Sequence, residues 1–284
     1  MLGSDHWIMI GVFDSGHGGL TVLRAMADRL PERAFLYFGD HAHMPYGERT
    51  SQEIIGLTRA AVEYLFNQGC HLVILACNTA AAVALRTLQR EWLPIHHPDR
   101  RILGVLVPTV EAVTGVSWMS ETPAIAAART IAVFATRRTV ASNAYPEEIR
   151  KRAPQVTVVQ HACTGLVSLI EQEASRESLR AAVAEHVAAL MARLEGQRPG
   201  AVMLGCTHYP LVADLFADAL PPGIEIFSQP DVVAQSLAAY LMRRPQSDTH
   251  AGPQSLRFVT TGGAAAATRF ASTFFGRPVP YTAV

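Results

Sequence analysis

The amino-acid sequence predicts an α/β protein with two pseudo-symmetric, doubly wound lobes, mainly parallel sheets and an active site in the cleft between them. The first observation is that short apolar runs alternate with helix-length segments along the 284 residues. This pattern is typical of parallel strands covered by helices on both faces. The second is a weak repeat, since IGVF at 10–13 and IAVFA at 131–135 each lead into a turn and a helix. The third is that a strand ending in a cysteine follows in each half, at Cys77 and at Cys206.

The strands and helices of the first half are predicted from the spacing of apolar residues and from a helix-capping pattern. Apolar residues recur at helical spacing over Leu20–Leu30, which Pro31 ends. Thr50 and Glu53 have the spacing of a capping box, so a helix is expected to begin there. The predicted elements are, in order, a strand (Ile8–Phe13), a helix (Leu20–Leu30), a strand (Phe35–Phe38), a helix ending near Gly69, a strand (Leu72–Ala76) and an Ala-rich helix ending near Trp92.

The rest of the chain continues the same alternation. Residues 94–101 are rich in Pro, His and charge and are interpreted as a surface connection, and Ser117–Thr122 as an exposed loop. Two longer helices are expected over Leu179–Leu194 and Val232–Met242. The predicted strands are Ile102–Leu106, Ile131–Ala135, Val156–Gln160, Ala201–Leu204, Ile224–Phe227 and Leu256–Val259.

We place the first lobe at residues 1–103 plus 229–284 and the second at residues 104–228. Ligands of open parallel sheets collect at the carboxyl ends of the strands. Five chemically useful residues come directly after predicted strands or in the loops that follow them, and they converge if the two lobes face each other. They are Asp14, Tyr46, Cys77, Thr136 and Cys206.

Composition excludes several classes of protein. The 24 basic residues balance the 24 acidic residues, so charge gives no argument for a nucleic-acid or membrane partner. The apolar runs have the length of strands, and Met1–Asp5 shows no signal-peptide core, so we expect a cytoplasmic protein. Its four cysteines are then reduced thiols, and without C-x-x-C spacing no structural zinc site is expected.

Cys77 and Cys206 are the candidate catalytic residues. Each follows a buried strand and precedes small polar residues, Asn78-Thr79 and Thr207-His208. A thiol at the start of a helix lies beside unpaired N–H groups, which favour the thiolate. Free cysteines are also common as small core residues, and we interpret Cys70 and Cys163 in that way.

Other polar residues are weighed against structural roles. Asp14, in FDSGHGG, is either a helix N-cap or a site residue, and His208 can hold or receive a proton beside Cys206. The four histidines at His41, His43 and His96-His97 are interpreted as solvated or packing residues, since a metal site needs more ligands. No G-x-G-x-x-G, P-loop or G-x-S-x-G motif is present, which disfavours nucleotide binding and serine hydrolysis.

Two thiols on opposite faces of a bound carbon can invert a stereocentre. One thiolate removes the proton and the other thiol returns a proton to the far face, with no metal and no net redox change. The α-hydrogen of an amino acid is weakly acidic, so the base must be close, oriented and dry. N–H and hydroxyl donors from Asn78, Thr79 and Thr207 would stabilise the anion.

The chain resembles the cofactor-independent aspartate/glutamate racemase family. The likeness runs in family order through GVFDSGHGGLTVL, FGDHAHMPYGE, ACNTAAA, ATRRTVASNAY, ACTGLVSLIE and LGCTHYPL. It implies two pseudo-symmetric α/β domains, racemisation of glutamate for peptidoglycan, no cofactor or metal, and a homodimer as one option. The implied acid/base pair is Cys77 and Cys206, assisted by Asp14, His208 and Glu171. The implied substrate-binding residues are Asp14, Ser15, Tyr46, Gly47, Asn78, Thr79, Thr207 and His208.

Departures from the family pattern keep alternatives open. The stretch Gly39–His43, GDHAH, stands where GDTAR is common, and Thr164-Gly165 replaces a Pro-containing turn. Ser228-Gln229 stands where an Asp-Ser pair is common, and Val116–Ala127 is a longer loop than in many members. The alternatives are a racemase for aspartate or another amino acid, and a binding homologue without catalysis.

Overall fold

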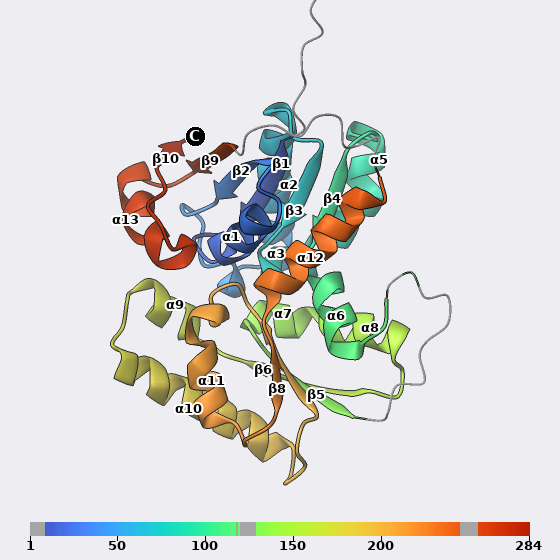
Figure 1. The fold of residues 1–284 in the computed structure, drawn as a ribbon, viewed down its shortest axis with the longest axis vertical. Helices are drawn as coiled ribbons and strands as arrows, with labels where there is room; N and C mark the ends of the chain where they lie inside the picture. Colours follow the sequence, from blue (N-terminus) through green and yellow to red (C-terminus); the bar gives the residue numbers. More distant parts are fainter. Residues whose placement is uncertain (1–8, 118, 120–128, 245–254) are drawn as a thin grey trace, which may run out of the picture.

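The computed structural model describes residues 9–117, 119, 129–244 and 255–284. They form an α/β protein with two sheets stacked end to end (Figure 1). The strands are β1 (Ile10–Asp14), β2 (Ala34–Gly39), β3 (Leu72–Leu75), β4 (Arg101–Gly104), β5 (Thr130–Ala135), β6 (Thr157–Ala162), β7 (Ala201–Gly205), β8 (Glu225–Phe227), β9 (Ser255–Thr260) and β10 (Tyr281–Ala283).

Helices connect nearly all of these strands. The main ones are α1 (Gly19–Arg29), α2 (Ser51–Asn67), α3 (Asn78–Val83), α4 (Leu85–Thr87), α5 (Leu93–His96), α6 (Leu106–Thr114), α7 (Arg137–Ser142), α8 (Ala144–Arg152), α9 (Leu166–Glu171), α10 (Arg176–Arg193), α11 (Ala213–Ala219), α12 (Gln229–Met242) and α13 (Ala264–Phe275). Three further short turns are η1 (Tyr46–Glu48), η2 (Leu88–Trp92) and η3 (Tyr209–Val212).

The two sheets repeat one strand order, as the internal repeat predicts. The first sheet has the order β10-β9-β2-β1-β3-β4 and the second β6-β5-β7-β8, so β2-β1-β3-β4 corresponds to β6-β5-β7-β8. Every strand pair is parallel. The predicted fold class is therefore confirmed, with the two repeated stretches forming the corresponding strands β1 and β5.

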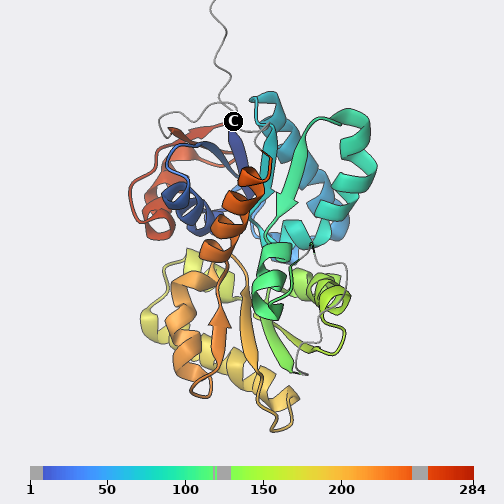
Figure 2. The same cartoon turned by 45° about the vertical axis from the view of Figure 1, so that its right-hand side comes forward.

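Burial follows from this arrangement. Strands β1, β3 and β7 are buried along their whole length because helices cover both faces of each sheet. Helix α1 packs against α12 and α13, and α2 lies on the other side of the first sheet (Figures 1 and 2). The capping box that was predicted at Thr50 and Glu53 is present at the start of α2.

Helix α12 leads from the second sheet back to the first, where it packs on α1 (Figure 2). Helix α6 packs against both α12 and α8. Because α12 joins one sheet to the other, the limits that we assigned to the lobes, 1–103 with 229–284 and 104–228, stay a prediction.

Several sequence-based boundaries were wrong. The segment 94–101 is not entirely a connection, because α5 continues to His96 after the π-helical turn η2. Strand β4 ends at Gly104, and Leu106 already begins α6. The prediction also missed α8, α9, α11, α13 and β10. Residues 1–8 and most of the predicted loops at 117–122 and 116–127 lie outside the described residues.

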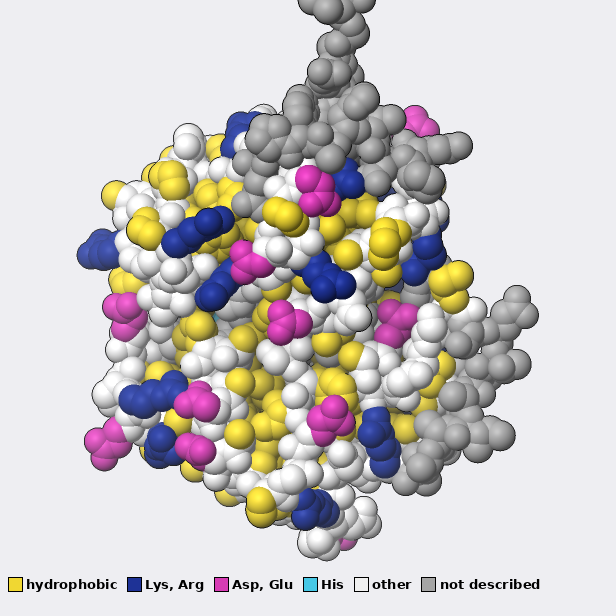
Figure 3. Space-filling model, viewed as in Figure 1, with side chains coloured by type: hydrophobic (Ala, Val, Ile, Leu, Met, Phe, Trp, Pro, Cys, Tyr) yellow, Lys and Arg dark blue, Asp and Glu magenta, His cyan; other side chains and the backbone are white. Residues whose placement is uncertain are grey.

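The charge distribution agrees with the balanced composition. On the face drawn in Figure 3, basic and acidic side chains are interspersed. Within the described ranges, no helix combines the length and the apolar character that a membrane span requires.

Candidate active site

The two predicted catalytic cysteines meet at one small cavity of about 50 Å³ between the lobes. Cys77 follows β3 and Cys206 follows β7, which are corresponding strands of the two sheets. Asp14 and Glu171 lie behind this lining rather than in it. The other predicted site residues all line the cavity, namely Ser15, Tyr46, Gly47, Asn78, Thr79, Thr207 and His208.

A larger cavity of about 760 Å³ lies elsewhere, among β4, α6, α8 and α12. Its lining includes Leu85, Glu148 and Tyr240, but neither Cys77 nor Cys206. Size alone would select this cavity, whereas converging thiols and polar groups select the smaller one. We therefore assign the smaller cavity as the candidate active site.

Cys77 is the N-cap residue of α3 and is 4% exposed. Its Sγ lies 3.4 Å from Oγ of Ser15. Burial and the nearby Asp14 carboxylate raise the pKa of Cys77 to about 12, although the Ser15 hydroxyl and backbone N–H groups act in the opposite direction. The expectation that the helix N-terminus favours a thiolate was therefore wrong for Cys77, because desolvation outweighs the N–H groups.

Cys206 has a cationic partner. Nδ1 of His208 lies 3.9 Å from Sγ of Cys206, and Nε2 of His208 donates to Oε1 of Glu171 at 2.6 Å. Burial opposes the imidazolium, but Cys206 and Glu171 outweigh burial and raise the pKa of His208 to about 10. His208 is thus positively charged at neutral pH, which is the state that stabilises a neighbouring thiolate.

Glu171 accepts from a second histidine that the sequence analysis did not single out. Nδ1 of His17 lies 2.9 Å from Oε2 of Glu171, and Nε2 of His17 donates to the carbonyl of Ala267 at 3.0 Å. Burial would raise the pKa of Glu171, but the two histidines hold it well below its usual range. His17 and Glu171 are 154 positions apart, so no local spacing pointed to this contact.

Asp14 links the two lobes. Its carboxylate is fully buried, accepts from the N–H of Gly16 at 2.9 Å and accepts from Oγ1 of Thr207 at 3.2 Å. Burial raises the pKa of Asp14, while His208 and these hydrogen bonds oppose the rise. The N-cap residue of α1 is Gly18, so Asp14 is not the helix cap that the alternative interpretation assumed.

Tyr46 and Asn78 line the cavity, but protein groups already bind their side chains. The hydroxyl of Tyr46 donates to Oδ2 of Asp40 at 2.6 Å. Asn78 forms an amide pair with Gln229, whose Nε2 donates to Oδ1 of Asn78 at 2.9 Å, and Tyr145 donates to the same oxygen. The sequence analysis missed Asp40 as a site residue, and it noted Gln229 only as a departure from the family pattern.

Thr79 joins the lobes through hydroxyl contacts. Its Oγ1 lies 3.0 Å from Oγ1 of Thr136 and 3.3 Å from Oγ1 of Thr139. Thr136 also caps α7 by accepting from the N–H of Thr139. Gly47 approaches the same threonine, since a Cβ at Gly47 would lie 3.1 Å from Cβ of Thr136. These contacts bring the end of β5 into the cavity wall.

Sequence comparison identifies the family of this chain. Residues 10–237 match the model of the Asp/Glu/hydantoin racemase family. The glutamate racemase of Phenylobacterium zucineum is 45% identical over 281 residues, covering 96% of this chain and 98% of the relative. That of Ruegeria pomeroyi is 47% identical over 275 residues, covering 96% and 99%. The chain belongs to the Asp/Glu/hydantoin racemase family.

Solved structures of the racemase family share the fold over the full length. The glutamate racemase isoform RacE1 from Bacillus anthracis superposes with a TM-score of 0.83 at 28% identity, covering 99% of this chain and 98% of that one. The glutamate racemase from Francisella tularensis, solved in complex with D-glutamate, gives a TM-score of 0.82 at 26% identity, covering 98% and 97%.

His41 and His43, from the GDHAH stretch, lie outside the cavity lining. His41 packs against His17 and Tyr281 and hydrogen-bonds Oγ1 of Thr260 at 2.8 Å. His43 lies 2.7 Å from Oδ1 of Asp40. Both have a polar partner, and His41 also packs against aromatic rings.

The predictions for the remaining histidines and cysteines hold in part. His97 lies 3.2 Å from Glu63 and packs on Trp92, and His96 is exposed. All four cysteines are free and buried. Cys163 was interpreted as packing only, but it also lines the cavity because β6 ends level with β5.

Proposed function

We propose that this protein interconverts L- and D-glutamate by proton transfer at Cα between Cys77 and Cys206. The observation that carries the proposal is that two thiols, from corresponding strand ends of two lobes, line one small cavity. Each thiol has its own polar neighbour, Ser15 for Cys77 and His208 for Cys206. A pair of equivalent acid/base groups is what inversion of a stereocentre needs.

The reaction balances without a redox step. One thiolate accepts the α-proton, the electron pair stays on the substrate as a carboxylate-conjugated carbanion, and the opposite thiol gives a proton to the other face. The first thiol is then protonated and the second is a thiolate, ready for the reverse direction. Burial of both sulfurs keeps water away from the carbanion.

The resting charges differ on the two sides of the cavity. Cys206 lies beside the His208 imidazolium, whereas Cys77 lies near the buried Asp14 carboxylate. The raised pKa of Cys77 suits this thiol to the role of acid, and the imidazolium beside Cys206 suits Cys206 to the role of base. By family position, Cys206 serves the L-isomer and Cys77 the D-isomer.

The lysine content supports a cofactor-independent reaction. Pyridoxal phosphate enzymes hold their cofactor as a Schiff base on a lysine, and Lys151 is the single lysine of this sequence. Its Nζ donates to Glu148 at 2.7 Å on α8 and is not part of the cavity lining. A lysine-bound cofactor therefore has no attachment point at the two thiols.

The names of the relatives support glutamate as the substrate. The relatives described above are named glutamate racemases, and one was solved with D-glutamate. We place the activity in the cytoplasm, supplying D-glutamate for peptidoglycan, with free glutamate as the small-molecule partner. The four free cysteines suit a reducing compartment.

The test is racemisation of L-glutamate by the purified protein in D₂O. Circular dichroism should fall to zero as the enantiomers equalise, and deuterium should appear at Cα of D-glutamate. Cys77→Ala and Cys206→Ala should each abolish racemisation. Cys77→Ala should still exchange the α-hydrogen of L-glutamate without inversion, because Cys206 alone can remove and return a proton on one face.

Cys70→Ala is the matched control, since Cys70 is a buried thiol outside the cavity lining. It should retain racemisation. A panel of L- and D-amino acids, including aspartate, tests the substrate. Full racemisation in either cavity-cysteine variant would overturn the two-base reaction, and turnover of another amino acid without glutamate would overturn the substrate.

A further inference from the structure

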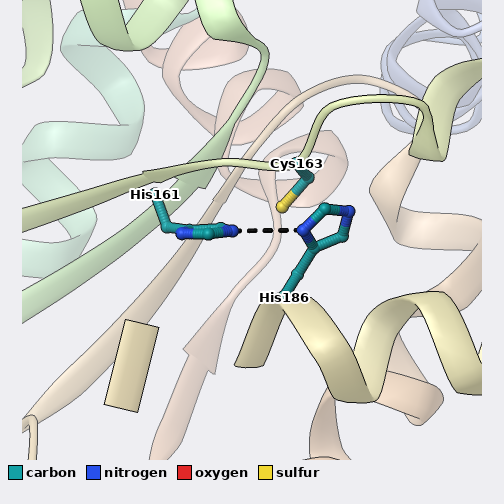
Figure 4. Close-up of side chains that lie close together, drawn as sticks. All are labelled: His161, Cys163 and His186. Atoms are coloured by element: carbon teal, nitrogen blue, oxygen red, sulfur yellow. Dashed lines mark hydrogen bonds between the residues drawn. The ribbon is translucent and has the colours of Figure 1, made fainter. Parts of the chain in front are cut away.

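A second group of reactive side chains lies at the carboxyl end of β6. His161 belongs to the strand, Cys163 follows it, and His186 comes from α10, which packs against β6 (Figure 4). Nε2 of His161 lies 3.1 Å from Nδ1 of His186. One ligand atom from each of the three residues lies within 4.8 Å of the other two.

The two imidazoles face each other through ring nitrogens. A hydrogen bond between two ring nitrogens needs one N–H and one lone pair, so a single proton occupies the space between them. A cation lying beside the line that joins the two nitrogens would replace that proton and accept a lone pair from each ring. The Cys163 sulfur points toward the same space (Figure 4).

The dimensions suit a tetrahedral ion. Zinc bonds of about 2.3 Å to sulfur and about 2.0–2.1 Å to nitrogen place neighbouring ligand atoms roughly 3.3–3.6 Å apart. The histidine pair is already near this separation at 3.1 Å. The thiol lies within 4.8 Å of one nitrogen of each ring, so it needs an approach of up to about 1 Å.

The chemical type of the ligands selects the metal. Two imidazoles and a thiolate suit zinc and its neighbours among the transition metals, whereas magnesium and calcium prefer oxygen. Cys163 is buried, but His161 and His186 are only partly buried. An ion can therefore reach the two histidines from solvent.

We propose that His161, Cys163 and His186 form a three-ligand site for a divalent transition-metal ion of the zinc class. The lack of C-x-x-C spacing argued against a structural zinc site, but here the ligands are an H-x-C pair and a histidine from the next long helix. The site is separate from the proposed proton transfer, although Cys163 also lines the catalytic cavity. Bound metal would therefore anchor one segment of the cavity wall.

The test uses cobalt(II), which takes tetrahedral sites and shows a thiolate-to-metal charge-transfer band in the near ultraviolet. The starting protein carries Cys77→Ser and Cys206→Ser, so that the catalytic thiols cannot bind the metal. After treatment with a chelator, titration should saturate at one cobalt ion per chain with this band, and zinc should displace the cobalt.

Three further substitutions in that background decide the ligands. Cys163→Ser should remove the band. Loss of a residue that only hydrogen-bonds a metal ligand weakens metal binding by roughly 10- to 100-fold, and His186→Ala should weaken cobalt binding by more than that. Cys70→Ala, at a buried thiol outside the cluster, should keep the band and the affinity. Far-ultraviolet circular dichroism checks that each variant is folded. No charge-transfer band in the starting protein, or a band that survives Cys163→Ser, would overturn the site.

Discussion

The carboxylate of Glu171 lies 2.6 Å from Nε2 of His208, and this contact fixes the charge beside Cys206. The two residues are 37 positions apart, on α9 and in the turn after β7. Glu171 does not line the cavity, so it acts through His208. We therefore expect Glu171 to be a positioning residue for the proposed acid/base pair.

Glu171→Gln should lower kcat for L-glutamate by about 10- to 100-fold at neutral pH, because His208 loses its anionic partner. The pKa of His208, about 10 in the native protein, should fall toward 6.5. Loss of activity with rising pH should therefore begin at lower pH than in the native protein. A pH profile of kcat measures this shift, with exposed Glu173→Gln as the control. Superimposable profiles for Glu171→Gln and the native protein would contradict the role.

The same pair should make stability depend on pH. His208 has a pKa that is raised in the folded state, so its contribution is complete below pH 6.5 and is lost as pH rises through about 10. Glu171 has a lowered pKa, so its contribution is present above 4.5 and is lost at more acidic pH. Urea unfolding should show Glu171→Gln less stable by about 3 kcal/mol near pH 6, with the gap narrowing toward pH 10. A gap that does not vary with pH would argue against this linkage.

Gln229 is expected to matter more for stability than for turnover. It is fully buried at the start of α12, and its Nε2 lies 2.9 Å from Oδ1 of Asn78 and 3.0 Å from the hydroxyl oxygens of Thr109 and Tyr145. Gln229→Leu leaves Nδ2 of Asn78 without its acceptor, removes the amide donor from the other three contacts, and should cost about 3 kcal/mol. Chemical denaturation measures this loss, and exposed Gln52→Leu should change stability by less than about 0.5 kcal/mol. If both variants unfold at the same denaturant concentration, the Asn78–Gln229 pair contributes little.

Repeated local patterns allowed much of the fold to be predicted from the sequence. Strands β1 and β5 have similar apolar stretches, and each cysteine strand ends in a recognisable polar pair, so the alternation and the cysteine pairing were both visible. The capping box at Thr50 was visible for the same reason, since its partner is three residues away. Features that depend on residues close together in the sequence can be predicted in this way.

Contacts between distant segments could not be predicted from the sequence. His17 stood unnoticed among glycines because its partner Glu171 belongs to the other lobe. The ionisation of Cys77 was predicted in the wrong direction, since only the structure shows how completely the thiol is desolvated and how near Asp14 lies. Burial and charge come from the assembled fold, and no spacing in the sequence reports them.

Gly18 should tolerate no side chain, although its backbone would accept one. Its φ of −53° and ψ of −40° are ordinary helical values. A Cβ there would overlap Oγ1 of Thr207 and Nδ1 of His208 and would lie 2.6 Å from Cε1 of His208. These neighbours cannot move freely, because Thr207 donates to Asp14 and His208 donates to Glu171.

Gly18→Ala should therefore push the two lobes apart and displace His208 from Cys206. A displacement of about 1 Å at a reacting group can cost on the order of 100-fold, and we expect a loss of that size in kcat/KM for L-glutamate. Overpacking should also lower the free energy of unfolding by about 1–3 kcal/mol. Gly56→Ala is the matched control, since Gly56 lies within α2 with nothing near its Cβ position. The control should keep full activity and gain up to about 1 kcal/mol from helix propensity. Equal activity in the two alanine variants would show that the close approach of Gly18 to Thr207 and His208 does not position the catalytic groups.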